Sequence, residues 1–129
     1  MGKGIIDISQ LQTPPQKHEL ATARFFANLG KDVVFIVPSN IPEVYRPDIL
    51  MDDIEWEIKS PIGKSRRTIE KNFHKAALQS KNIIFDLRRI NVPEAQCLKQ
   101  LEREFLDKRT HRLLVITKSG ELVKFPKKD

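Results

Sequence analysis

The chain has 129 residues, enough for one domain with a single hydrophobic core, and we expect residues 1–129 to fold as that domain. Although 40% of the residues are apolar, no apolar run reaches the roughly 18–20 residues that span a membrane, and the start of the chain does not form a signal peptide, so we expect no membrane contact. The net charge of +6 favours a polyanionic partner such as nucleic acid, and the single cysteine excludes an internal disulfide.

Proline and glycine residues divide the chain into short elements. Residues 1–15 are predicted to be irregular, and Pro14-Pro15 then favour a helix over 16–29 that ends at Gly30. The apolar run over 33–37 predicts a buried strand that ends at Pro38. The other predicted elements are strands on either side of Asp52-Asp53, a helix over 66–80 with Ser65 as N-cap, a strand over 82–87, a helix over 93–108, and a hairpin over 112–117 and 121–125. This order predicts an α/β fold, a mixed β-sheet with flanking helices.

The hairpin around Asp52-Asp53 is the most informative segment for function. If these two residues form a two-residue loop, the strands pair 51 with 54, 50 with 55, 49 with 56 and 48 with 57. Asp48 would then lie directly across from Glu57, and Lys59 would share a face with Glu57. Facing carboxylates destabilise a sheet unless positive charge lies between them. The pattern therefore indicates metal-assisted chemistry on a negatively charged substrate.

Basic and polar residues follow this hairpin. Lysines and arginines are concentrated between residues 59 and 81, where they could contact a phosphate backbone or form a solvated helix face. Four polar residues of the helix are spaced by four, three and four positions and share one stripe, which could contact substrate or face water: Thr68, Asn72, Lys75 and Gln79.

The hairpin resembles the signature of the PD-(D/E)XK nuclease superfamily. Pro47-Asp48 and Glu57-Ile58-Lys59 occupy the positions of its motif, and the predicted order from residue 16 to 87 matches its αβββαβ, restriction-endonuclease-like core. The resemblance implies that the Asp and Glu bind a divalent metal and that the Lys positions the attacking water or stabilises the developing charge. Glu19, on the first helix, matches a further acidic residue that many members have.

A closer resemblance, from about residue 17 to 123, is to the C-terminal toxin domains of CdiA proteins of contact-dependent growth inhibition that cleave tRNA. It includes His18-Glu19, Arg46–Ile49, Trp56–Ser60, Thr68-Ile69, Asn72, Gln79-Ser80 and Asp86–Arg89. It implies a metal-dependent nuclease, delivered as part of a larger effector, with a cytoplasmic site of action and an immunity protein as partner. The sequence begins with Met and does not include the delivery region of those proteins, so we expect either an excised toxin domain or a free-standing relative.

The resulting site hypothesis assigns four residues to catalysis. Asp48, Glu57 and Glu19 are the expected ligands of a divalent metal, Mg²⁺ first, with Mn²⁺ or Zn²⁺ as alternatives. Lys59 is expected to orient water and stabilise the transition state. Glu55 is the rival ligand. The expected substrate-binding residues are Ser60, Arg66, Arg67, Thr68, Asn72, Lys75 and Gln79.

Several residues have a structural explanation beside a functional one. Trp56 alternates away from Glu57 and is expected in the core, and Cys97 is expected to be a buried helix residue. Asp86 could pair with Arg88 or Arg89, which could otherwise bind phosphate. Three functions remain open: a tRNA-cleaving nuclease, a DNA endonuclease of the same superfamily, and a non-catalytic nucleic-acid-binding module.

Overall fold

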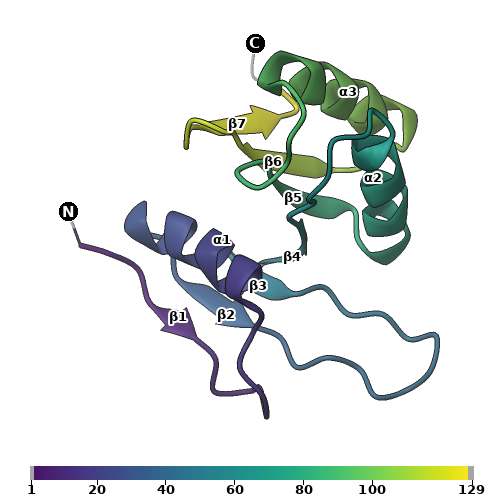
Figure 1. Ribbon diagram of the computed structural model, residues 1–129. Helices are drawn as coiled ribbons and strands as arrows, with labels where there is room; N and C mark the ends of the chain where they lie inside the picture. Colours follow the sequence, from purple (N-terminus) through teal and green to yellow (C-terminus); the bar gives the residue numbers. More distant parts are fainter. Residues whose placement is uncertain (1, 128–129) are drawn as a thin grey trace.

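The computed structural model describes residues 2–127, which form three helices and seven strands (Figure 1). The helices are α1 (Lys17–Asn28), α2 (Thr68–Gln79) and α3 (Glu94–Asp107). The strands are β1 (Ile6–Asp7), β2 (Val33–Phe35), β3 (Ile49–Met51), β4 (Ile54–Lys59), β5 (Asn82–Asp86), β6 (Arg112–Ile116) and β7 (Leu122–Phe125). In this part of the chain, no helix is long and apolar enough to cross a membrane.

The seven strands form one mixed sheet in the order of the chain, β1 to β7. The pairs β2–β3, β3–β4 and β6–β7 are antiparallel, and β1–β2, β4–β5 and β5–β6 are parallel. The parallel connections β4–α2–β5 and β5–α3–β6 cross over through helices, as parallel neighbours require. The predicted mixed α/β fold is confirmed, including the αβββαβ order from α1 to β5 and the C-terminal hairpin.

The element prediction is wrong at the start of the chain. Residues 1–15 were expected to be irregular, yet Ile6 and Asp7 pair in parallel with β2 as strand β1. The approach depends on Gly4, whose amide donates to the Ala27 carbonyl at 2.7 Å. A side chain at Gly4 would collide with the Lys31 carbonyl oxygen, so only glycine lets the segment come this close. A two-residue strand held by such packing leaves no periodic pattern in the sequence.

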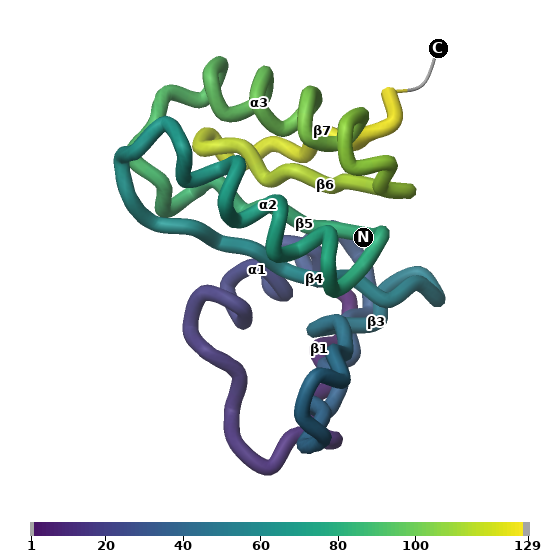
Figure 2. Tube along the Cα trace, turned by 90° about the vertical axis from the view of Figure 1, so that its right-hand side faces the viewer, coloured from purple at the N-terminus to yellow at the C-terminus, as the bar shows by residue number. Residues whose placement is uncertain are grey.

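The helices cover opposite faces of the sheet, as strand β5 demonstrates. Ile84 packs in one core cluster with Phe26 of α1. Its neighbours Ile83 and Phe85 pack in the other cluster, with Phe73 of α2 and residues of α3. Because successive strand residues point to opposite faces, α1 lies on one side of β5 and the pair α2–α3 on the other. In the side view, α3 lies above β6 and α1 lies below β5, on opposite sides of these strands (Figure 2).

Helix α2 begins two residues later than predicted. The Ser65 hydroxyl accepts a hydrogen bond from the Arg67 amide at 3.1 Å, and the first helical residue is Thr68. Ser65 therefore makes a local turn before the helix rather than its N-cap, a use that competes with capping for serine. The predicted end of α1 is confirmed, since Gly30 has a φ of +90° and donates to the Ala27 carbonyl.

Candidate active site

The β3–β4 hairpin has the predicted register. Asp52 and Asp53 form its two-residue loop with φ values of +57° and +62°, as a type I′ turn requires. The pairs 49–56, 50–55 and 51–54 are present. The predicted pair 48–57 is not part of this ladder: the Asp48 amide donates at 2.9 Å to the carbonyl of Trp56, which already pairs with Ile49. The Asp48 and Glu57 carboxyls are nevertheless close enough for the charge of Asp48 to raise the pKa of Glu57.

The side chain of Asp48 is held in place by a hydrogen bond from the backbone of strand β4. The Ile58 amide donates to Asp48 Oδ2 at 2.8 Å. Glu57 is buried, and Lys59 Nζ lies 3.6 Å from its Oε2. Trp56 and Ile58, which alternate with these residues, are in the core, and the Trp56 indole donates to the Met51 carbonyl at 3.0 Å. The alternation of β4 therefore sends its polar residues Glu57 and Lys59 to one face and its apolar residues to the other.

The two carboxyls hold their protons unusually strongly. Burial, above all, raises the pKa of Glu57 to about 8, the charge of Asp48 adds to the rise, and Lys59 opposes it. Burial also raises the pKa of Asp48 to about 6, against the lowering effect of the Ile58 amide. The pair thus has more acid groups than neighbouring cations can neutralise. Such perturbed carboxyls are typical of functional sites.

Glu19 contributes charge to this pair from helix α1. Its charge raises the pKa of both Asp48 and Glu57. Its Oε1 accepts from the Gln16 amide at 3.1 Å, half of a capping box at the helix start. Among residues 2–127, no group of three or more His, Cys, Asp and Glu side chains is arranged to hold a metal ion. The geometry thus presents Asp48 and Glu57 together, with Glu19 near them but engaged by its own helix.

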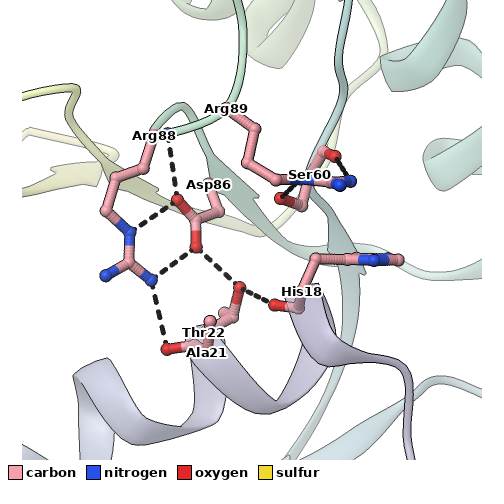
Figure 3. Close-up of polar contacts among 7 residues, drawn as sticks. All are labelled: His18, Ala21, Thr22, Ser60, Asp86, Arg88 and Arg89. Carbon is pink, nitrogen blue, oxygen red and sulfur yellow. Dashed lines mark hydrogen bonds and ion pairs between the residues drawn. The ribbon is translucent and has the colours of Figure 1, made fainter.

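A second buried carboxylate, Asp86 at the end of β5, has a different environment (Figure 3). Arg88 binds it through two nitrogens, with Nε 2.9 Å from Oδ1 and Nη2 2.8 Å from Oδ2. The Thr22 hydroxyl donates to Oδ2 at 2.7 Å, and Arg88 Nη2 also donates to the Ala21 carbonyl at 3.1 Å. Burial would raise the pKa of Asp86, but these hydrogen bonds outweigh it and lower the pKa below its ordinary value.

The network joins β5 to the helix that carries Glu19. Thr22 is buried one turn after Glu19, and its hydroxyl is also 3.1 Å from the His18 carbonyl oxygen. The expected pairing of Asp86 with one of the two arginines is confirmed for Arg88. Sequence reasoning missed Thr22, because nothing local marks a helix threonine that meets a strand residue 64 positions later.

The predicted substrate-binding residues are divided among several places. Ser60 is buried directly after Lys59, and Arg89 Nε donates to its hydroxyl at 3.0 Å while Nη2 donates to its carbonyl (Figure 3). Arg66 and Arg67 are exposed before α2, and Arg66 lines a shallow hollow with residues of α3. Asn72 donates to the Thr68 carbonyl at 2.9 Å, one turn earlier in α2.

The four residues of the predicted polar stripe on α2 do not form one continuous exposed surface. Thr68, Asn72 and Gln79 are half-buried. Lys75 is exposed and lines a hollow shared with Glu104 and Lys108 of α3. The rival ligand Glu55 is also exposed, opposite Leu50 near the hairpin turn.

A cavity of about 730 Å³ opens beside Asp48 and was not predicted. Its walls are residues 11–16 before α1 and residues 35–41 after β2, and Glu19, Arg46 and Asp48 border it. The two segments are 19 or more residues apart in the chain, so sequence patterns gave no signal beyond their prolines.

Comparison with protein families identifies the chain. The model of the contact-dependent growth inhibition CdiA C-terminal domain matches residues 45–122, more than half of the chain. The chain belongs to this family. A solved structure described as a CdiA-CT/CdiI toxin and immunity complex from Burkholderia pseudomallei has a similar fold, with a TM-score of 0.68 and 22% identity over 95% of this chain and 98% of the other. No curated protein matches the chain.

The family model covers only part of the candidate site. The CdiA C-terminal domain model includes Asp48, Glu57 and Lys59, and the Asp86–Arg88 pair. Helix α1 with Glu19, and both walls of the large cavity, lie outside the matched residues. The hairpin therefore falls within the part of the chain that the family model describes, while helix α1 and the cavity walls lie outside it.

Proposed function

We propose that this CdiA C-terminal domain is a metal-dependent nuclease that hydrolyses phosphodiester bonds, with tRNA as its substrate and growth inhibition as its effect. The observation that carries the proposal is the pair Asp48 and Glu57. Both carboxyls have raised pKa values, and the ion pair between Lys59 and Glu57 is the one that the pair makes among residues 2–127. A site with this deficit of positive charge suits a cation, and a bound cation would in turn attract an anionic substrate.

The donor set fits a hard divalent cation. Asp48 and Glu57 offer carboxylate oxygens on one face of the hairpin, and Mg²⁺ is commonly bound by one or two carboxylates together with water and substrate phosphate. Glu19 adds negative charge from α1. When bound, the metal would neutralise charge on the phosphate and lower the pKa of a water molecule.

The chain's own residues would orient the reaction. Lys59 is partly exposed, with 20% of its side chain accessible, so its ammonium group can reach both Glu57 and a bound phosphate. We assign it to holding the attacking water and to stabilising the charge that develops on the phosphoryl oxygens. The assignment follows the resemblance to the PD-(D/E)XK pattern at Pro47-Asp48 and Glu57–Lys59.

The substrate and the partner are proposed from family resemblance. The net charge of +6 supports a nucleic-acid substrate, and the resemblance to tRNA-cleaving CdiA toxin domains favours tRNA over DNA. The Burkholderia pseudomallei structure is a toxin and immunity complex, so we propose that this chain also has a cognate immunity protein and is delivered within a larger effector.

The test compares two glutamines placed on the same strand. Purified wild type, Glu57→Gln and Glu55→Gln are incubated with total tRNA or plasmid DNA, with Mg²⁺ or Mn²⁺ or with EDTA. We expect wild type and Glu55→Gln to cleave tRNA when metal is present, and Glu57→Gln to be inactive while its circular dichroism is unchanged. Full activity of Glu57→Gln would refute the site, and cleavage of plasmid alone would replace tRNA by DNA.

A further inference from the structure

The large cavity beside the hairpin is continuous with the proposed catalytic carboxyls. Asp48 and Glu19 are among its lining residues, so a group that fills the cavity lies beside the proposed metal ligand Asp48. Its volume of about 730 Å³ is within the range of roughly 300–1,000 Å³ found for pockets that hold small organic groups.

The walls combine rigid apolar surfaces with amides. Pro14, Pro15 and Pro38 contribute apolar rings, and the buried Phe35 lies behind them. The amides come from both walls: Gln12 and Gln16 from one, and Asn40 from the other. The open cavity thus presents apolar and polar surface in about equal parts. Such a lining suits a nucleobase, since the faces of a base are apolar and its edge carries hydrogen-bond donors and acceptors.

The position of the charges agrees with this occupant. Arg46 borders the cavity together with Asp48, so a cation is available for the phosphate of a nucleotide whose base lies between the walls. Glu19 and Asp48 would repel a phosphate placed deeper in the cavity without a metal. The base is therefore the part of the nucleotide that enters.

We propose that the cavity between residues 11–16 and 35–41 binds one unpaired nucleotide beside the scissile phosphate, so that the enzyme cleaves single-stranded loops and not duplex stems. The inference rests on the proposed nuclease function. A paired base is stacked within its helix and cannot enter a pocket unless it is extruded, whereas loop bases are free to do so.

The experiment uses two RNA hairpins that contain the same seven-nucleotide segment, in the loop of one and in the stem of the other. Wild-type protein with Mg²⁺ or Mn²⁺ is expected to cleave this segment at least about tenfold faster in the loop, because extrusion from a stem is costly. Equal rates would overturn the inference and leave the nuclease function standing. No cleavage of either hairpin would overturn both.

Substitutions in the cavity walls test whether the preference for unpaired nucleotides depends on the cavity. Gln12→Ala and Asn40→Ala remove one amide from each wall, and we expect each to raise KM for the loop hairpin about 3–10-fold with little change in kcat. The matched control is Asn28→Ala, an exposed amide at the end of α1 that does not line the cavity. Unchanged KM in both wall variants, or the same rise in Asn28→Ala, would overturn the assignment of the base to this cavity.

Discussion

Two groups of buried carboxyls in this domain have opposite electrostatics. Asp86 receives two hydrogen bonds from the Arg88 guanidinium and one from Thr22, and its pKa is lowered although it is buried. Glu57 forms an ion pair with Lys59, Asp48 accepts a hydrogen bond from the Ile58 amide, and their pKa values are raised to about 8 and about 6. Burial is common to both groups, so the difference lies in how many partners accompany it. A fully paired carboxylate stabilises the fold, while an underpaired one is available for a cation or a substrate.

The largest expected effect is the loss of cleavage activity when the Lys59 side chain is removed. We expect Lys59→Ala to lower the rate of tRNA cleavage by about 100–1,000-fold, the loss typical of a missing electrostatic stabiliser. Its melting temperature should change little, because the lost ion pair is long, at 3.6 Å. Single-turnover kinetics measure the effect, with the exposed Lys81→Ala as control. A variant within threefold of wild type would exclude Lys59 from catalysis.

Removal of the charge on Asp86, the fully paired carboxylate, should lower the stability of the fold. Asp86→Asn weakens the two hydrogen bonds from the Arg88 guanidinium and the one from Thr22, and we expect a loss of about 2–3 kcal/mol in the free energy of unfolding. Urea denaturation measures this loss. Glu57→Gln, by contrast, should be as stable as wild type or more stable at pH 8. If the two variants changed stability alike, the distinction between the groups would fail.

The pH dependence of stability should have opposite signs for the two groups. In EDTA, folded Glu57 keeps its proton to about pH 8, whereas an unfolded chain loses it near 4.5, so stability should fall as the pH rises through this window. The slope is at most about 1.4 kcal/mol per pH unit. Asp86 has a lowered pKa, so its contribution is present above 3.8 and is lost as the pH falls below that value.

Urea denaturation between pH 3 and pH 9 tests both signs. Glu57→Gln should flatten the profile between pH 5 and pH 8, and Asp86→Asn should flatten it at the acidic end. An unchanged profile in Glu57→Gln would mean that its carboxyl is not the titrating group.

The smallest expected effect is that of added metal on stability. Mg²⁺ or Mn²⁺ at tenfold its dissociation constant should stabilise the folded state by about 1.4 kcal/mol. The effect should be larger at pH 8 than at pH 6, because binding requires deprotonated Asp48 and Glu57. Thermal unfolding with and without metal measures it, and Glu57→Gln should show no shift. An equal shift in that variant would place the metal elsewhere.

Local pattern accounts for the parts of the structure that could be predicted. The alternation of Trp56 and Ile58 with Glu57, and a two-residue loop at Asp52-Asp53, determine the register that brings Asp48 to Glu57. These interactions span ten residues or fewer. The start of α2 was misplaced because Ser65 can either cap a helix or close a turn, and both uses fit the same sequence.

The sequence by itself determined the order of elements, the hairpin and its facing carboxyls, because each depends on the spacing of neighbouring residues. Only the tertiary structure decided that Thr22 secures Asp86, that β1 joins the sheet, and that the two loops enclose a cavity at Glu19 and Asp48. These features join segments distant in the chain, and their positions follow from the packing of α1 on the sheet. Packing of that kind depends on side-chain shape in three dimensions, which no single stretch of sequence specifies.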